Sequence, residues 1–187
     1  IMYTYPSRIN DRLLTVIKEA KHICHYLDLP LQHISERVLR GMGRKTTTGE
    51  IKELIEKIRE YLPDIALRST FILGYPGETD EEFNELLAFL REYRLDWVGA
   101  FPYYREEGTA AAKIKPQVHP GTRKKRARIL IQEQQAISLQ KNQELIGREI
   151  MVLLEKKDDA GWVGRSYREA PEIDGLIKLE LEPEEAS

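Results

Sequence analysis

The chain has 187 residues, and its 29 Lys and Arg residues nearly balance its 31 Asp and Glu residues, for a net charge of −2. This balance excludes an overall polyanion binder but not a local basic patch. The single cysteine, Cys24, excludes a disulfide framework and any cluster built from several cysteines of this sequence. No apolar run is long enough to cross a membrane and the first residues do not resemble a secretory signal, so we expect a soluble, cytoplasmic setting.

The first 146 residues alternate between the hydrophobic periods of strands and helices. Four strands are predicted there, at residues 1–5, 26–31, 65–73 and 97–103. Helical segments separate them, and βα units of this kind form right-handed crossovers and a parallel sheet. Four units are too few for an eight-stranded barrel, which takes about 250 residues. We therefore expect an α/β fold with an open parallel sheet or part of a barrel.

Helix starts in this part are marked by capping residues. Two Thr–Glu pairs have the capping-box spacing, Thr47–Glu50 and Thr79–Glu82. A long helix is predicted over residues 122–146 and is closed by Gly147.

After Gly147 the hydrophobic period changes to that of strands. Three short strands are predicted, at residues 149–155, 161–167 and 175–181, with a hairpin turn at 158–161. Residues 182–185 are expected to form an acidic tail. The sequence thus divides into an α/β part, residues 1–146, and a small β module, residues 147–187.

Ligands bind at the carboxyl ends of the strands in parallel α/β sheets, and this rule selects four loops. They are residues 5–8, 32–33, 74–78 and 103–109, all polar, and three carry Gly or Pro at the bend. We favour a ligand site on this rim over four independent turns. His33 is the one histidine of the sequence that falls on it.

One face of the strand at 65–73 is more apolar than the other, and helices must cover it. Arg68 and Thr70 are therefore expected to point to the other face. A guanidinium inside a sheet needs an anionic partner, because burying it alone is costly. That partner is either a ligand carboxylate or Asp28, and the sequence leaves both open.

Three other patterns carry weaker signals. The turn at 74–77 opens a helix and could host an anion, but it matches neither GxGxxG nor a P-loop, and Glu78 could cap the same helix. His22 and Cys24 lack a metal-ligand spacing, and no metal ligand is assigned. The basic run at 123–128 either grips nucleic acid or forms a solvated helix face.

Four longer stretches match a known family. They read YLDLPLQH at 26–33, RSTFILGYPGET at 68–79, GAFPYYREEGT at 99–109 and EAPEIDG at 169–175. In this order they resemble the radical SAM methylthiotransferases, over essentially the whole chain. The resemblance implies that residues 1–146 are the last four βα units of a radical SAM partial barrel. Residues 147–187 would then begin a TRAM-like β-barrel.

The resemblance also implies a chemistry. In this family a reduced 4Fe–4S cluster cleaves S-adenosylmethionine (SAM), the resulting radical removes a hydrogen from the target, and sulfur arrives through a second cluster before a further SAM methylates it. The family's CxxxCxxC loop would lie before Ile1, and Cys24 matches no position of it. The cluster ligands are therefore expected outside this sequence, and this piece alone is expected to be inactive.

The later barrel strands of the family hold SAM, with an apolar side chain at Ile72 and a close backbone approach at Gly74 on the adenine side. By strand position, the implied SAM-binding residues are Gln32, Arg68, Ile72, Gly74, Phe101 and Tyr103. Gln32 and Arg68 would contact the ribose or the carboxylate, and no catalytic residue is assigned.

Motif details favour the branch that modifies the β-carbon of an aspartate in a small-subunit ribosomal protein over the MiaB-type branch, which modifies tRNA. This preference rests on the residues at three places: Gln32-His33, Glu106-Glu107 and residues 170–175. We expect a monomer that contacts ribosomal RNA through its C-terminal module. One alternative is a ribosome- or RNA-binding module without catalysis. Another is a barrel hydrolase, for which the adjacent Glu106 and Glu107 are poorly placed as an acid–base pair.

Overall fold

A parallel sheet organises the first part of the chain, and the computed structural model describes residues 1–158 and 161–180. The strands are β1 (Tyr26–Asp28), β2 (Ala66–Leu73) and β3 (Trp97–Pro102), in the order β1-β2-β3. In the register, Arg68 of the central strand lies between Asp28 and Trp97. The predicted α/β class with an open parallel sheet is confirmed.

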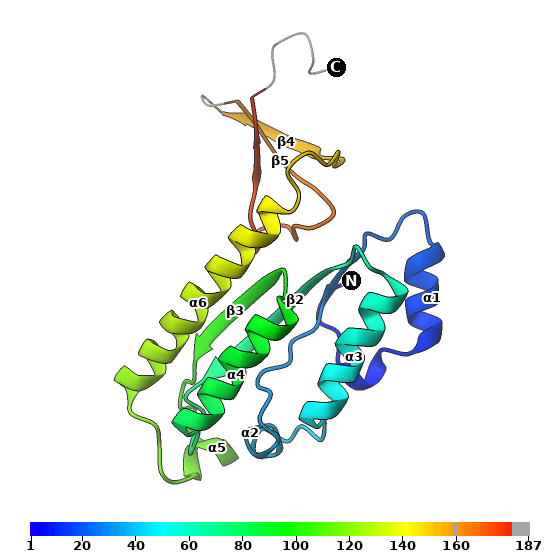
Figure 1. Ribbon diagram of the computed structural model, residues 1–187. Helices are drawn as coiled ribbons and strands as arrows, with labels where there is room; N and C mark the ends of the chain where they lie inside the picture. Colours follow the sequence, from blue (N-terminus) through cyan, green and yellow to red (C-terminus); the bar gives the residue numbers. More distant parts are fainter. Residues whose placement is uncertain (159–160, 181–187) are drawn as a thin grey trace.

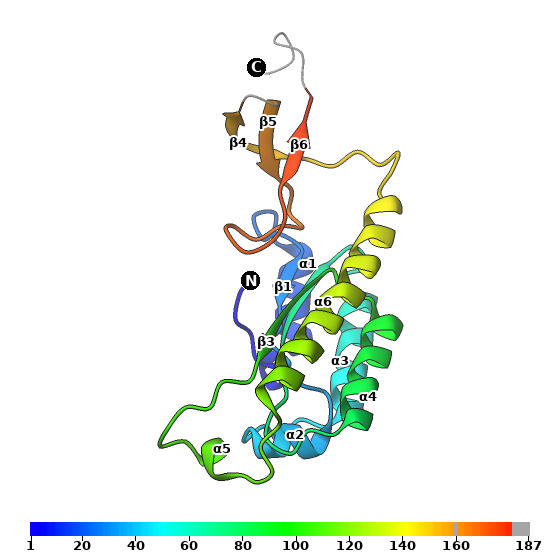
Figure 2. The ribbon, with the colours of Figure 1, turned by 90° about the vertical axis from the view of Figure 1, so that its left-hand side faces the viewer.

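Helices cover one face of this sheet, and the other face stays open (Figures 1 and 2). A short 3-10 turn, Pro6–Arg8, precedes them. Their bounds are α1 (Asp11–Glu19), α2 (Glu36–Gly41), α3 (Thr48–Tyr61), α4 (Asp80–Tyr93), α5 (Ala110–Lys113) and α6 (Pro120–Gln143). The long helix α6 packs against β3, β2 and α4, and α1 packs against α3. No helix among the described residues combines the length and apolarity needed to cross a membrane.

The apolar core lies between the sheet and its helices. Leu67, Phe71 and Leu73 of β2 are fully buried there, and the ring of Phe71 meets Phe89 of α4 edge-on, with centroids 6.4 Å apart. On the open face, Arg68, Thr70 and Ile72 of β2 are only partly buried. The predicted phase of this strand is therefore confirmed.

The helix starts follow the capping residues. Thr47 and Thr79 each accept a hydrogen bond from the backbone of the Glu three residues later and complete the predicted capping boxes of α3 and α4. Helix α6 begins earlier than predicted, because Pro120 suits the first helical position. It ends at Gln143, and a turn carries the chain to Gly147, whose φ is +82°.

The prediction of a strand at residues 1–5 is wrong. The segment lies beside β1, where the carbonyl of Ile1 accepts a hydrogen bond of 2.9 Å from the N–H of Asp28. Tyr3 then adopts a φ of +57°, and its N–H donates to the carboxylate of Asp28 at 3.1 Å instead of to a neighbouring strand. This left-handed residue interrupts the pairing, so the sheet has three described strands instead of four.

The C-terminal module is an antiparallel sheet in the order β4-β5-β6. Its strands are β4 (Leu153–Asp158), β5 (Gly161–Arg165) and β6 (Ile177–Leu179), shorter or later than predicted. The pairing register shifts between Leu154 and Lys156, a bulge that the sequence pattern does not reveal. The predicted turn at 158–161 includes residues 159–160, and the predicted acidic tail lies at 182–185. Residues 159–160 and the tail lie outside the described residues.

The module meets the α/β part at the amino-terminal end of the strands (Figure 1). The loop between β5 and β6 makes this contact. The indole N–H of Trp97 donates to the carbonyl of Arg168 at 2.5 Å, and the Arg168 guanidinium donates to the buried Asp96 at 2.8 Å. An apolar cavity of about 680 Å³ lies beside this contact, with Tyr26 and Met151 in its lining.

Candidate functional site

The open face of the sheet carries a buried ion-pair network around Arg68. Its Nη1 donates to Asp28 at 3.0 Å and to the Thr70 hydroxyl at 3.1 Å, and its Nε donates to Asp174 at 3.3 Å. Asp174 also accepts a 2.6 Å hydrogen bond from the Tyr26 hydroxyl. The sequence left open whether the anionic partner of Arg68 is a ligand carboxylate or Asp28, and the structure shows Asp28 in this position. Asp174 was missed, because nothing in the local pattern connects two residues that are 106 positions apart.

Burial and neighbouring charge act in opposite directions on the pKa of Arg68. Burial lowers the pKa of the Arg68 guanidinium, but the hydrogen bond and charge of Asp28 outweigh it, so that its pKa is raised. Burial, followed by the hydrogen bond to Asp174, raises the pKa of Tyr26. Arg68 is therefore a fixed cation between two carboxylates, and the cluster of Arg68, Asp28 and Asp174 has a net charge of −1.

Gly99 lies on the open face without a side chain, and the space that a side chain would fill there is called here the Gly99 hollow. A Cβ atom at this position would lie 3.3 Å from the ring of Phe101 and 3.5 Å from both the Nη2 of Arg68 and the hydroxyl of Thr70. Ile72 pairs with Phe101 across β2 and β3, so both side chains lie on the same face. Ile72 is half-buried and Phe101 is 57% exposed. The hollow thus joins apolar surface to hydrogen-bonding groups.

The rim above this hollow is formed by strained or tightly packed backbone. Gln32 has a φ of +71° and bridges to β2, where its N–H donates to Thr70 and its carbonyl accepts from Ile72, both at 2.8 Å. Gly74 has a φ of +72°, and a Cβ there would lie 2.4 Å from Cγ of Arg123. In this structure Gly74 is thus required by its backbone conformation and by Arg123 of α6.

Tyr103 lies at the same rim, where β3 ends. Its ring meets Tyr75 edge-on with centroids 5.5 Å apart, and the Arg123 guanidinium lies 5.0 Å from its centre. Its hydroxyl is buried without a hydrogen-bond partner among the described residues. The structure therefore brings the six predicted SAM-binding residues to one face and its rim, with Arg68 furthest from the carboxyl ends of the strands.

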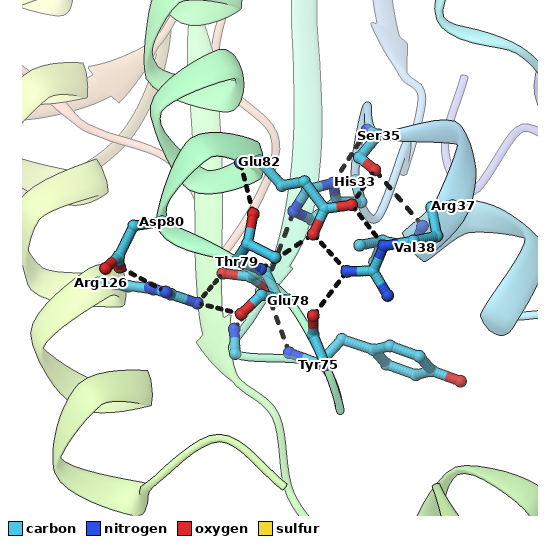
Figure 3. Close-up of polar contacts among 12 residues, drawn as sticks. His33, Ser35, Arg37, Val38, Tyr75, Glu78, Thr79, Asp80, Glu82 and Arg126 are labelled. Carbon is cyan, nitrogen blue, oxygen red and sulfur yellow. Dashed lines mark hydrogen bonds and ion pairs between the residues drawn. The ribbon is translucent and has the colours of Figure 1, made fainter. Parts of the chain in front are cut away.

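Glu78 occupies the anion position at the start of the helix that follows β2 (Figure 3). Its carboxylate accepts from the N–H of Gly74 at 2.6 Å and of Tyr75 at 3.2 Å, and it forms a 2.7 Å ion pair with Arg126. Burial raises the pKa of Glu78, although Arg126 opposes this. Because a carboxylate of the chain fills this position, the turn at 74–77 is not available for a phosphate.

His33 lies behind the rim and not on it. Its side chain is fully buried, and its Nδ1 accepts a 3.0 Å hydrogen bond from the N–H of Ser35 (Figure 3). Its Nε2 lies 3.7 Å from the Glu78 carboxylate and has no hydrogen-bond partner in the part of the chain that the structure describes. Burial lowers the pKa of His33 to about 4. It is therefore neutral at pH 7 and faces the interior, so it is not exposed to a ligand at the rim.

The residues of the open face fit SAM, and the described residues do not fit an iron–sulfur cluster. The Gly99 hollow joins an aromatic ring and Ile72 to the donors of Arg68 and Thr70, which suits a ligand with a purine and sugar hydroxyls. In contrast, no group of three or more His, Cys, Asp or Glu side chains in residues 1–158 and 161–180 could hold a metal ion. Cys24 is exposed, and His25 forms a 3.0 Å pair with Asp64 instead.

Comparisons with known proteins find two family models in the chain. Residues 1–90 match the Radical SAM superfamily model, and residues 146–186 match the TRAM domain model. Among solved structures, coproporphyrinogen III oxidase (HemN) from Escherichia coli, a radical SAM enzyme, covers 73% of this chain and 31% of its own, with a TM-score of 0.55 and 24% identity. That likeness supports the fold alone. The class is thus a radical SAM protein with a TRAM module.

Curated relatives narrow the class. The "Ribosomal protein uS12 methylthiotransferase RimO" of Carboxydothermus hydrogenoformans is 46% identical over 97% of this chain and 42% of its own length. The protein of the same name from Chloroflexus aurantiacus is 48% identical over 95% of this chain and 40% of its own length. The chain therefore belongs to the radical SAM methylthiotransferase family, and it spans about two fifths of the curated relatives that it matches.

Proposed function

We propose that this chain is part of a methylthiotransferase that adds a methylthio group to the β-carbon of an aspartate in ribosomal protein uS12. The observation that carries the proposal is the 46% identity, over 97% of the chain, to a relative that bears this name. The action on a ribosomal protein assigns the enzyme to the cytoplasm.

Within that enzyme, the open face would hold part of SAM. When bound with a cluster held elsewhere in the protein, SAM would supply radical chemistry for the target C–H bond. Ile72 and Phe101 would provide apolar contacts to the adenine, and Gln32 a polar contact at the rim. The Tyr103 hydroxyl, buried without a partner among the described residues, is a further candidate donor.

Arg68 is suited to a neutral oxygen and not to a carboxylate. Its Nε and Nη1 are already engaged by two carboxylates, and its Nη2 faces the Gly99 hollow. Because the cluster has a net charge of −1, a third carboxylate would be repelled. Of the two groups expected from the sequence, the geometry favours a hydroxyl over the SAM carboxylate.

Modification of uS12 in cells tests the proposal. The full-length protein is expressed in a bacterial strain that lacks its own uS12 methylthiotransferase, and uS12 peptides are analysed by mass spectrometry. We expect the target aspartate to gain one methylthio group. The Ile72→Glu variant should lose this activity, because a carboxylate would replace the apolar adenine contact. The exposed Leu139→Ala change on α6 should leave it intact.

Two outcomes would contradict the proposal. Methylthiolation of tRNA adenosine without any change in uS12 would show that the tRNA branch is correct. No modification of either molecule by a folded, cluster-loaded protein would show that the assignment of this activity is wrong.

A further inference from the structure

Residues 103–128, named here the rim basic segment, concentrate positive charge. They hold eight Lys or Arg residues and two Glu residues, a net charge of +6 in a chain whose net charge is −2. The segment follows β3 and continues into α6, so it lies at the carboxyl-end rim of the sheet (Figure 2). The C-terminal module is at the opposite end of α6.

The eight cations divide into two sets. Arg123 and Arg126 are buried and engaged internally. The other six are exposed, and none forms an ion pair with a described residue: Arg105, Lys113, Lys115, Lys124, Lys125 and Arg128. Cations of α3 and α4 are paired instead, as in Lys52–Glu92 at 2.9 Å and Arg91–Glu133 at 2.7 Å.

The exposed start of α6 is basic. Its first turn has no acidic residue, whereas the first turn of α4 has three. Lys124, Lys125 and Arg128 are spaced so that they share one face of the helix. Their charges therefore act together on whatever approaches this face.

The buried arginine Arg123 fixes the segment in place. It donates to the carbonyls of Tyr103 at 3.1 Å and Val118 at 2.8 Å and to the side chain of Gln117 at 3.0 Å. Gln117 in turn donates to Ala111 at 3.2 Å and to Ile114 at 2.9 Å. The loop and the start of α6 are therefore held together, and their exposed cations are pre-positioned.

An aromatic side chain completes the surface. Tyr104 is 79% exposed and precedes Arg105 in the loop. Exposed aromatics beside cations form stacking platforms for unpaired bases, and cations contact the phosphate backbone. An acidic peptide would use the cations but would not require Tyr104. The combination favours RNA.

We propose that the rim basic segment is an RNA-docking surface that binds the phosphate backbone of structured RNA, separately from the C-terminal module. Under the proposed function, the RNA beside a ribosomal protein substrate would be ribosomal RNA. RNA binding does not depend on methylthiolation, so the failure of one proposal does not imply the failure of the other.

The test is the salt dependence of RNA binding. The full-length protein is titrated onto a labelled RNA hairpin between about 50 and 200 mM KCl. Each lost phosphate contact reduces the magnitude of the negative slope of log K against log[salt] by about 0.7–0.9. The triple variant K124Q/K125Q/R128Q should reduce the magnitude of this slope by about 2 and weaken RNA binding roughly tenfold. The matched triple variant R12Q/K18Q/K21Q, three exposed cations on and after α1, should change neither.

Further arms identify the partner. Small ribosomal subunits and total tRNA are compared as competitors, and preference for the subunit would assign ribosomal RNA as the source. A Tyr104→Ala change should weaken binding to an RNA with an unpaired loop more than to a blunt duplex. The proposal is overturned if the K124Q/K125Q/R128Q variant keeps the wild-type slope, or if a polyglutamate peptide binds as tightly as RNA.

Discussion

On the helix-covered face of β2, Leu67, Phe71 and Leu73 are fully buried among the helices, whereas on the open face Arg68 and Thr70 are joined by hydrogen bonds. The two sets alternate along one strand. One face provides hydrophobic stabilisation, and the other keeps polar groups ordered beside a hollow. The strand thus combines stability and candidate function because its side chains alternate between two environments.

Removal of the central ring on the covered face should have the largest effect. Phe71→Ala is expected to lower the free energy of unfolding by about 4 kcal/mol, because it leaves a cavity beside Phe89. Chemical denaturation measures this. The matched change on the open face, Phe101→Ala, should cost less than about 1 kcal/mol, since that ring is 57% exposed. Similar losses for both would show that the two faces do not differ in this way.

The ion-pair network should come next. Arg68→Ala leaves the buried carboxylates of Asp28 and Asp174 without their counterion, and we expect a loss of about 3 kcal/mol. Arg91→Ala breaks an exposed pair with Glu133 and should cost less than about 1 kcal/mol. If the two variants unfold at the same denaturant concentration, the network is not a structural support of the open face.

A pH titration of the unfolding free energy measures the contribution of the Glu82 carboxylate. Burial alone raises the pKa of Glu82, but hydrogen bonds from Arg37, Thr79 and Ser35 outweigh it and bring the pKa to about 2. A lowered carboxyl pKa gives stability that is present above the ordinary value of 4.5 and is lost as the pH falls towards 2. Glu82→Gln should therefore lose roughly 2 kcal/mol at pH 7 and show a flatter dependence below pH 4.5.

The exposed Glu85→Gln is the control for this titration. It should leave the stability at pH 7 and its decline below pH 4.5 unchanged. A Glu82→Gln curve parallel to that of the wild type would contradict the prediction.

The smallest effect on stability should come from the hollow. Gly99→Ala adds a methyl group 3.3–3.5 Å from its neighbours, so stability should change by less than about 1 kcal/mol. The same methyl group fills space that the proposed function assigns to SAM. The full-length, cluster-loaded protein should therefore bind SAM more weakly, as measured by calorimetry. Unchanged SAM affinity would place the ligand elsewhere.

Local signals predicted most of the fold. The capping boxes located α3 and α4, and the alternation in β2 identified the face that helices cover. The strand predicted at residues 1–5 failed because the left-handed Tyr3 has no signature in a period-two pattern. The length of β1 was overestimated for a related reason, since it ends at Asp28 before the backbone turns at Gln32.

The site was less accessible to sequence reasoning. The pairing of Arg68 with Asp28 could be anticipated because a buried cation requires an anion, and few acidic residues lie on neighbouring strands. Asp174 and Arg126 act through tertiary contacts with distant segments, which no local spacing encodes. His33 was expected on the rim, yet the chain turns it inward towards Glu78.

Helix α6 has a geometric consequence. Its 24 residues, at about 1.5 Å each, make a rod of about 36 Å that begins inside the rim basic segment and ends before the C-terminal module. The rod is anchored along its length to β2, β3 and α4, so its two ends cannot approach each other. It acts as a ruler. A partner that touches both ends must present two binding features about 36 Å apart.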